Sequence, residues 1–281
     1  MAREHWRQRL ADTQSLGCKQ LFLQWTGIFG GAAAENWQLS DAQIADLLDI
    51  CAELGMGVHL GLPYDDRWWK QISLANAAGP AAFLAHATSH AERYRALSTW
   101  PAHAAFRGWY IPYELEQYHW ADAGRMALLA PALQAMARAA AATSGRAPTI
   151  STYFSRLQTQ GDLAALWGFL LDRVDLHPMI QDGVGVAGLD NLAALEPLRQ
   201  MLLGRHAPFD LIVELFEQLP GPADGSDFQA RSADFGRVRR QWDVARDYGA
   251  QRIVAYAIDP WGLGEAPEAQ ALRRQWRKAR G

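Results

Sequence analysis

The sequence has few cysteines, no long apolar run and no excess of positive charge. Two Cys in 281 residues exclude a disulfide-stapled scaffold, and Cys18 and Cys51 are expected to be small buried hydrophobes. No stretch approaches the length of about 18 apolar residues that a membrane span requires, and the N-terminal segment lacks the apolar centre of a signal peptide. With a net charge of −3, we expect neither nucleic acid nor an anionic membrane as a partner. The composition leaves the oligomeric state open.

Several catalytic and cofactor motifs are also missing. The sequence has no H-x-H or H-E-x-x-H spacing for a metal and no G-x-S-x-G elbow for a serine hydrolase. Residues 183–188, "GVGVAG", match G-x-G-x-x-G, but Asp182 and Asp190 flank them and would face the phosphates of a dinucleotide. We therefore expect a flexible loop beside a pocket, and neither a cofactor nor a metal. The basic stretch "RRQWRKAR", residues 273–280, predicts a solvated helix end.

What the sequence does contain is a regular alternation of short apolar runs and helical patterns. Hydrophobic residues make up 49% of the chain and charged residues 20%, which is enough for a sizeable core. Seven apolar runs are expected to be strands: residues 18–29, 56–64, 106–117, 148–154, 175–185, 209–218 and 251–261. A helical pattern follows each of them. The first of these helices, residues 39–55, has Ser40 and Gln43 placed as a capping box.

This alternation predicts an α/β protein whose parallel sheet is covered by helices. Seven strand–helix units are one short of a (β/α)8 TIM barrel, and the chain begins with a helix that stops at Gly17. We therefore expect a single barrel domain over residues 1–281 whose first strand is missing; an open doubly wound or seven-stranded sheet is the alternative. If an upstream segment has been trimmed together with a secretion signal, a periplasmic or secreted location is favoured, and otherwise a cytoplasmic one.

Polar and aromatic residues collect at the C-terminal ends of the predicted strands, where TIM barrels build their active sites. The residues expected to bind a substrate there are Gln24, Trp25, His59, Tyr110, Tyr113, Trp120, Tyr153, Gln181, Asp182, Glu217 and Trp261. The tryptophans and Tyr113 would stack on the apolar faces of sugar rings. The two amides and Asp182 would form hydrogen bonds with hydroxyl groups.

Two glutamates at strand ends are candidate catalytic residues: Glu114, in the string "RGWYIPYELEQYHW", and Glu214. With a missing first strand counted, they end strands four and seven, where many barrel glycosidases carry their acid/base and nucleophile. Carboxyl groups about 5–5.5 Å apart permit hydrolysis with retention, and about 6.5–9.5 Å apart with inversion. Trp109, Tyr110 and Tyr113 would desolvate Glu114 and suit it as the acid. The alternative is that both glutamates are rim residues in salt bridges.

Four motifs, taken in order, resemble a known family: "QWTG" from residue 24, "GWYIPYELE" from 108, "QDGVG" from 181 and "VELFE" from 213. They are similar to motifs of the bacterial TIM-barrel family catalogued as domain of unknown function 4434, which is treated as glycoside-hydrolase-like. The resemblance covers nearly the whole chain and implies the barrel and a sugar substrate. It places in the pocket Gln24, Trp25, Tyr110, Glu114, Gln181, Asp182 and Glu214. The sequence departs from the family in lacking the opening strand.

We therefore predict a glycoside hydrolase that acts on a bacterial polysaccharide, such as an exopolysaccharide, or on an oligosaccharide by a retaining mechanism. Glu114 would protonate the glycosidic oxygen, Glu214 would attack the anomeric carbon, and Glu114 would then activate water. One alternative is a glycan-binding barrel without activity, and another is a metal-dependent polysaccharide hydrolase or deacetylase. The long loop of residues 220–236 is predicted to border the pocket and to be mobile.

Overall fold

The structure, a computed structural model, describes residues 3–32, 36–220 and 228–280. The chain divides into two compact units. Unit 1 comprises Met1–Leu10 and Cys18–Pro178, and unit 2 comprises Ala11–Gly17 and Met179–Gly281. The first helix, α1 (Arg3–Ser15), contributes residues to both units.

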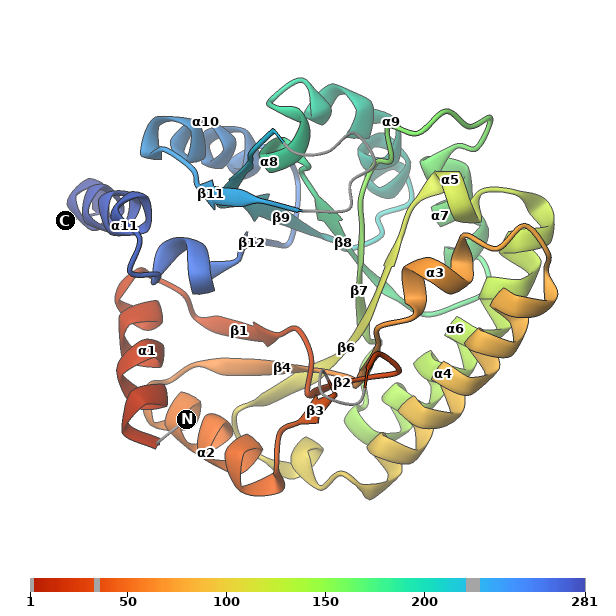
Figure 1. Cartoon of the computed structure of the whole chain (residues 1–281), viewed down its shortest axis with the longest axis horizontal. Helices are drawn as coiled ribbons and strands as arrows, with labels where there is room; N and C mark the ends of the chain where they lie inside the picture. The colour runs from red at the N-terminus through yellow and green to blue at the C-terminus, as the bar shows by residue number, and fades with distance from the viewer. Residues whose placement is uncertain (1–2, 33–35, 221–227, 281) are drawn as a thin grey trace. The chain divides into compact units, whose positions relative to one another are not determined.

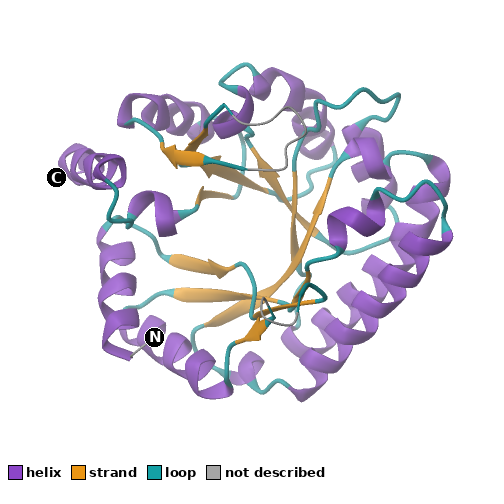
Figure 2. Ribbon diagram, in the orientation of Figure 1, coloured by secondary structure: helices purple, strands orange, loops and turns teal. Residues whose placement is uncertain are grey.

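Four parallel strands form the centre of unit 1 (Figure 1). In order of pairing they are β1 (Gln20–Leu23), β4 (Gly57–Gly61), β6 (Phe106–Leu115) and β7 (Thr149–Thr152). The helices of this unit are α2 (Asp41–Glu53), α3 (Trp68–Ile72), α4 (Ala78–Leu97), the short η1 (Trp100–Ala102), α5 (Gln117–Trp120), α6 (Ala123–Ser144) and α7 (Leu163–Leu171). Figure 2 shows α2, α4 and α6 along the outer side of these strands. The four strands predicted for this part of the chain are confirmed.

Helix α2 illustrates how local sequence determines an element of unit 1. Ser40 accepts a hydrogen bond from the backbone of Gln43, and the Gln43 side chain accepts one from the backbone of Ser40. This reciprocal pair satisfies two N–H groups that the helix start would otherwise leave unpaired. The apolar face of the helix is buried, with Leu47 and Cys51 at 0% exposure. Cys18, by contrast, is only half-buried, so its predicted burial is incomplete.

The predicted strand 18–29 is two strands, because the chain turns after Leu23. The second piece, β2 (Gly27–Phe29), belongs to a separate sheet with β3 (Trp37–Gln38) and β5 (Tyr64–Asp65). Glycine is needed at position 27, the start of β2, because a Cβ there would lie 2.8 Å from the carbonyl oxygen of Trp37 on the paired strand.

Unit 2 contains the parallel strands β9 (Asp210–Glu214) and β12 (Arg252–Tyr256) and all but the first two residues of β8 (His177–Gln181). Its helices are α8 (Val184–Ala187), α9 (Asn191–Gly204), α10 (Phe235–Arg246), the helical segment η2 (Ile258–Gly262) and α11 (Pro267–Arg280). The three strands and the three long helices lie where the apolar runs and helical periods predict them.

An antiparallel hairpin replaces part of the predicted loop 220–236. Strand β10 (Phe216–Gln218) pairs with β11 (Ala230–Ser232), and the side chains of Glu217 and Arg231 form an ion pair of 3.0 Å across the pair. The prediction of one long loop is therefore wrong at its C-terminal end. Its predicted mobility concerns residues 221–227, which lie outside the described residues.

Within the described part of the chain, every helix is too short or too polar to span a bilayer.

Candidate functional site

Glu214 ends strand β9, and its carboxylate is buried at 3% exposure. Its Oε2 accepts a hydrogen bond of 2.7 Å from the backbone N–H of Gly185 in α8. A Cβ on Gly185 would lie 2.8 Å from this same oxygen and 2.6 Å from the carbonyl oxygen of Phe216. Glycine is therefore required at position 185, because any side chain would displace the carboxylate or the backbone that holds it.

The segment "GVGVAG" is thus a carboxylate-binding turn. It forms the short helix α8, so the prediction of a flexible loop is wrong. Asp182 accepts the N–H of Val184 at 3.1 Å, and Glu214 accepts that of Gly185. Two N–H groups that a dinucleotide motif would offer to phosphates are therefore directed at carboxylates of the chain itself.

Asp182, predicted to bind sugar hydroxyls, supports Glu214 from inside the protein. It is 1% exposed. Its Oδ1 also accepts the backbone N–H of Glu214 at 3.3 Å, and its Oδ2 accepts the side-chain amide of Gln241 at 2.7 Å. Burial raises the pKa of Asp182 to about 6, against the lowering effect of these hydrogen bonds. Because both oxygens are bound within the protein, the prediction of a direct substrate contact is corrected to a supporting role.

Two residues of α10 complete this arrangement, and the sequence analysis does not identify either. Gln241 donates to Asp182 and to the carbonyl of Glu214. Arg237 donates to the carbonyl oxygens of Glu214 (2.8 Å), Phe216 (2.6 Å) and Val184 (3.2 Å). Burial lowers the pKa of Arg237, while the charges of Asp182 and Glu214 raise it. Positions 237 and 241 share one face of a helix, which is the signal that could have singled them out.

Glu114, the penultimate residue of strand β6 in unit 1, has different surroundings. It is half-buried and its charge acts on the hydroxyls of two tyrosines. Burial chiefly raises the pKa of Tyr64, and the charge of Glu114 raises it further. Burial also chiefly raises the pKa of Tyr153, followed by the charge of Glu116 and then that of Glu114. Trp25 stacks on Tyr64 with ring centroids 5.3 Å apart. Glu114 therefore lies near aromatic residues, of which Trp25 and Tyr153 are half-buried and Tyr64 is buried.

Trp69 of α3 belongs to the same aromatic surroundings, although the strand ends do not include it. Its ring lies edge-on to Tyr153 at 6.2 Å, and 37% of the residue is exposed. The signal for it in the sequence is weak, because the adjacent Trp68 has the same residue type and is fully buried.

Glu116 has a structural role. It is 0% exposed, and its carboxylate accepts the backbone N–H groups of Tyr118 and His119 as the N-cap of α5. The ring of His119 contacts it at 2.5 Å. These bonds engage the carboxylate of Glu116 within the protein, so Glu116 is not retained as a candidate catalytic residue.

Two predicted stacking residues of unit 1 lie in an aromatic core instead. Trp120 is 0% exposed and packs on Trp68 with centroids 5.6 Å apart. Tyr113 is 3% exposed, packs on Trp68 at 4.9 Å and accepts the backbone N–H of Asp65. Neither ring has a face for a sugar, so the stacking predicted for Trp120 and Tyr113 is wrong. Their apolar bulk is better buried than exposed.

Two other predicted contacts, His59 and Tyr110, are mid-strand and buried. His59 is 5% exposed, stacks on Phe22 at 4.2 Å and is bonded to Gln20 at 3.0 Å. The hydroxyl of Tyr110 lies 2.8 Å from the hydroxyl of Ser151 on the neighbouring strand. The prediction that His59 and Tyr110 contact the substrate directly is therefore wrong, because both side chains are buried and bonded within the protein. Strand alternation alone does not separate positions at the mouth from positions further down the strand.

The remaining predicted residues are accessible to different degrees. Gln24 and Gln181, at the ends of β1 and β8, are half-buried and stay predictions as substrate contacts. Trp261 is half-buried against Phe216, with centroids 5.9 Å apart. Glu217 is bound to Arg231 on the exposed hairpin, which argues against its predicted contact.

A metal-dependent reaction would require several ligands to converge. Among residues 3–32, 36–220 and 228–280, no three His, Cys, Asp or Glu side chains are grouped to hold an ion.

The fold of the chain is similar to that of several solved structures. A protein proposed to be an α-L-fucosidase, from Bacteroides thetaiotaomicron VPI-5482, has a TM-score of 0.72 at 14% identity, over 99% of this chain and 89% of that one. A GH113 β-1,4-mannanase has a TM-score of 0.57 at 10% identity, over 99% and 93%. The GH99 endo-α-mannosidase of Bacteroides thetaiotaomicron has 0.56 at 12%, over 99% and 85%. The chain thus has the α/β fold of the (β/α)8 barrels.

The family follows from the sequence. A family model described as Domain of unknown function (DUF4434) matches residues 1–271, and the chain belongs to this family. Among curated proteins, none matches the sequence.

Proposed function

We propose that this protein is a retaining glycoside hydrolase of a bacterial polysaccharide or oligosaccharide, with Glu214 as the nucleophile and Glu114 as the acid/base. The observation that carries the proposal is the support of Glu214. A buried carboxylate at a strand end has one oxygen held by the N–H of Gly185, while Asp182 and Arg237 hold its backbone. This restricts the side chain to one orientation, as a nucleophile requires.

The two glutamates have the unlike environments that their roles demand. The Gly185 N–H and the nearby Arg237 cation stabilise a negative charge on Glu214, which favours attack on carbon. Glu114 is half-buried, and its charge contributes to the raised pKa values of Tyr64 and Tyr153, so it lies in an aromatic setting with fewer fixed polar groups. Environments that separate the protonation states of two acids are how glycosidases assign the roles.

The reaction follows from these roles. Oε1 of Glu214 attacks the anomeric carbon while Glu114 gives its proton to the departing glycosidic oxygen, which leaves as an alcohol. Glu114, now ionised, takes a proton from water, and the hydroxide attacks the glycosyl ester and releases Glu214. Trp25 and Trp69 would hold sugar rings beside Glu114. The glycosidases of the same fold support the reaction class.

The test compares two isosteric variants on two kinds of substrate. Glu214→Gln should lower turnover of every substrate by about 10⁴-fold or more, because the covalent step is lost. Glu114→Gln should lower turnover of natural glycosides by about 10²–10⁴-fold but affect aryl glycosides with good leaving groups much less. Azide should partly rescue Glu114→Ala, because it attacks the glycosyl-enzyme without a general base.

Glu217→Gln serves as the control, since Glu217 follows Glu214 by three residues but lies within β10 and is paired with Arg231. It should retain activity. Melting temperatures of all variants are measured alongside. If the Glu114 and Glu214 variants lose stability yet keep their turnover, both residues are structural. Binding of glycans without turnover by the wild type would instead identify a glycan-binding barrel.

A further inference from the structure

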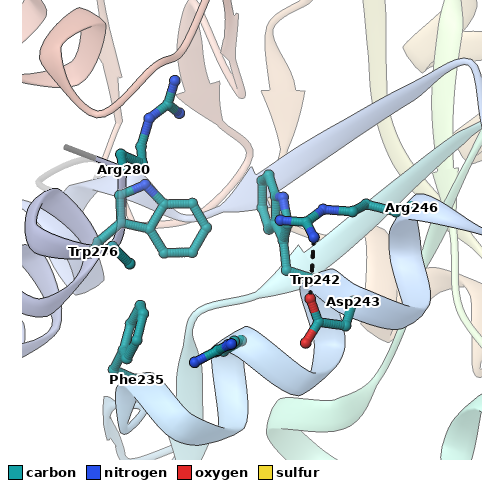
Figure 3. Close-up of a pocket in the computed structure, with 8 residues that line it drawn as sticks. Phe235, Trp242, Asp243, Arg246, Trp276 and Arg280 are labelled. Carbon is teal, nitrogen blue, oxygen red and sulfur yellow. Dashed lines mark hydrogen bonds and ion pairs between the residues drawn. The ribbon is translucent and has the colours of Figure 1, made fainter.

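A pocket of about 570 Å³ lies on unit 2, between helices α10 and α11 (Figure 3). Its volume is within the range of about 300–1,000 Å³ that is usual for small-molecule sites. The residues that line it are Phe235, Arg239, Trp242, Asp243, Arg246, Trp276, Ala279 and Arg280. The pocket uses none of the residues assigned to the proposed reaction.

Helix α10 has two functional faces. Arg237 and Gln241 face the carboxylates of β9 and Asp182. Arg239, Trp242 and Arg246 follow one another at helical spacing on another face and line the pocket. The pocket is therefore independent of the support of Glu214, although the same helix carries both.

Three aromatic rings form one wall of the pocket. Trp242 lies edge-on to Trp276 with centroids 4.8 Å apart, and Phe235 lies edge-on to Trp276 at 6.3 Å. All three residues are half-buried, so part of each ring is accessible. The indole N–H of Trp276 donates to the carbonyl of Leu16 at 3.1 Å. This bond orients the central ring and reduces the entropy that a ligand must overcome.

The polar wall of the pocket is positively charged. Three arginines and one aspartate line it, which leaves two positive charges in a chain of net charge −3. Asp243 is bound to Arg246 at 3.3 Å, and Arg280 donates to the carbonyl of Leu16. Arg239 is exposed and has no hydrogen bond or ion pair within the residues that the structure describes. The basic stretch "RRQWRKAR" therefore does more than end a helix in solvent, because its Trp276 and Arg280 form part of the pocket.

We propose that this pocket binds an acidic sugar, such as a uronate residue of an anionic polysaccharide. The C–H face of the sugar ring would lie on Trp242 and Trp276, as apolar ring faces do on aromatic side chains. The carboxylate would accept hydrogen bonds from Arg239 and Arg246, whose planar forks match its two oxygens. An acidic peptide shares the charge but lacks a rigid ring face to fill the aromatic wall. The site would hold a substrate chain or anchor the protein to one.

The test measures binding of tetragalacturonate to the full chain by calorimetry, with cellotetraose as the neutral probe. We expect tetragalacturonate to bind in the micromolar to millimolar range and more weakly as salt increases, and cellotetraose to bind at least about 10-fold more weakly. Arg239→Glu should weaken the binding of tetragalacturonate by about 10-fold or more. Arg138→Glu, which makes the same change on an exposed position of α6, should have no effect.

Trp242→Leu separates the aromatic contribution from the charge, and melting temperatures confirm that the variants are folded. Trp242→Leu should weaken the binding of tetragalacturonate without changing how that binding depends on salt concentration. The proposal is overturned if wild-type protein does not bind tetragalacturonate, if Arg239→Glu binds as well as wild type, or if cellotetraose binds equally. Displacement by poly-glutamate at the same charge concentration would identify an acidic-peptide site instead. Because binding is measured without turnover, failure of the glycosidase proposal would leave this test unaffected.

Discussion

Glu214 and Glu114 end two strands of similar sequence character, yet their surroundings differ. Glu214 is almost fully buried and is held by a backbone N–H, and its own backbone is bonded to Asp182, Gln241 and Arg237. Glu114 is half-buried and its neighbourhood is aromatic. The first environment immobilises a carboxylate, and the second provides surfaces on which a ligand can lie.

This difference indicates that the role of a carboxylate at a strand end depends on the groups that pack against it. Glu116 makes the same point, since it lies two residues beyond Glu114 and caps a helix while contacting the ring of His119. The polar groups behind Glu214 are supplied by α8 and α10, which are distant from it in sequence.

The largest expected effect concerns the buried acid behind Glu214. The folded-state pKa of Asp182, about 6, lies above the ordinary value of 3.8, so the folded protein binds this proton more tightly than the unfolded chain. Its contribution to stability is complete below pH 3.8 and is lost as the pH rises through about 6. The loss amounts to about 3 kcal/mol for a difference of this size. The Asn side chain of Asp182→Asn cannot ionise, so this variant should not show the loss of stability.

Urea unfolding of wild type and Asp182→Asn from pH 4 to pH 7 measures this effect. Subtracting the two free energies of unfolding cancels the carboxyls that both proteins share. The wild type should lose stability relative to the variant as the pH rises. A difference that stays constant with pH would mean that Asp182 is ionised throughout and that Glu214 has a second charge behind it.

A smaller effect is expected from adding one methyl group beside Glu214. In Gly185→Ala the new Cβ would displace Oε2 of Glu214 or the carbonyl of Phe216. If Glu214 is the nucleophile, as proposed, misplacing it should lower kcat by about 10–100-fold with little change in KM. Gly168→Ala is the control, because a Cβ at this helical position meets no atom within 4 Å. Unchanged kcat in Gly185→Ala would show that the orientation of Glu214 is not needed for activity.

The smallest effect tests the aromatic side of the comparison. Trp69→Ala removes a half-exposed ring beside Tyr153 and should raise KM for an oligosaccharide by about 2–10-fold, the usual size of one stacking contact. Trp120→Phe alters a fully buried ring of the same region and should lower the melting temperature without changing KM. If both variants change KM alike, exposure does not distinguish the binding residues from the core.

Much of the fold was predictable because its signals are local. Apolar runs and helical periods predict the seven parallel strands and the long helices, since backbone geometry repeats every two residues in a strand and every 3.6 residues in a helix. The capping box of Ser40 and Gln43 is likewise contained within four residues. The same pattern brings Glu114 and Glu214 to strand ends.

The sequence by itself therefore determined the order of the elements, the positions of the two glutamates and the membership of the family. Only the tertiary structure decided that Trp120 is buried while Trp69 is exposed, that "GVGVAG" binds carboxylates, and that Asp182 is a support for Glu214. These outcomes depend on which distant segments meet: Gln241 reaches Asp182 across 59 positions of the chain. Side-chain burial and hydrogen bonding depend on contacts between segments that are distant in sequence, and local periodicity carries no information about these contacts.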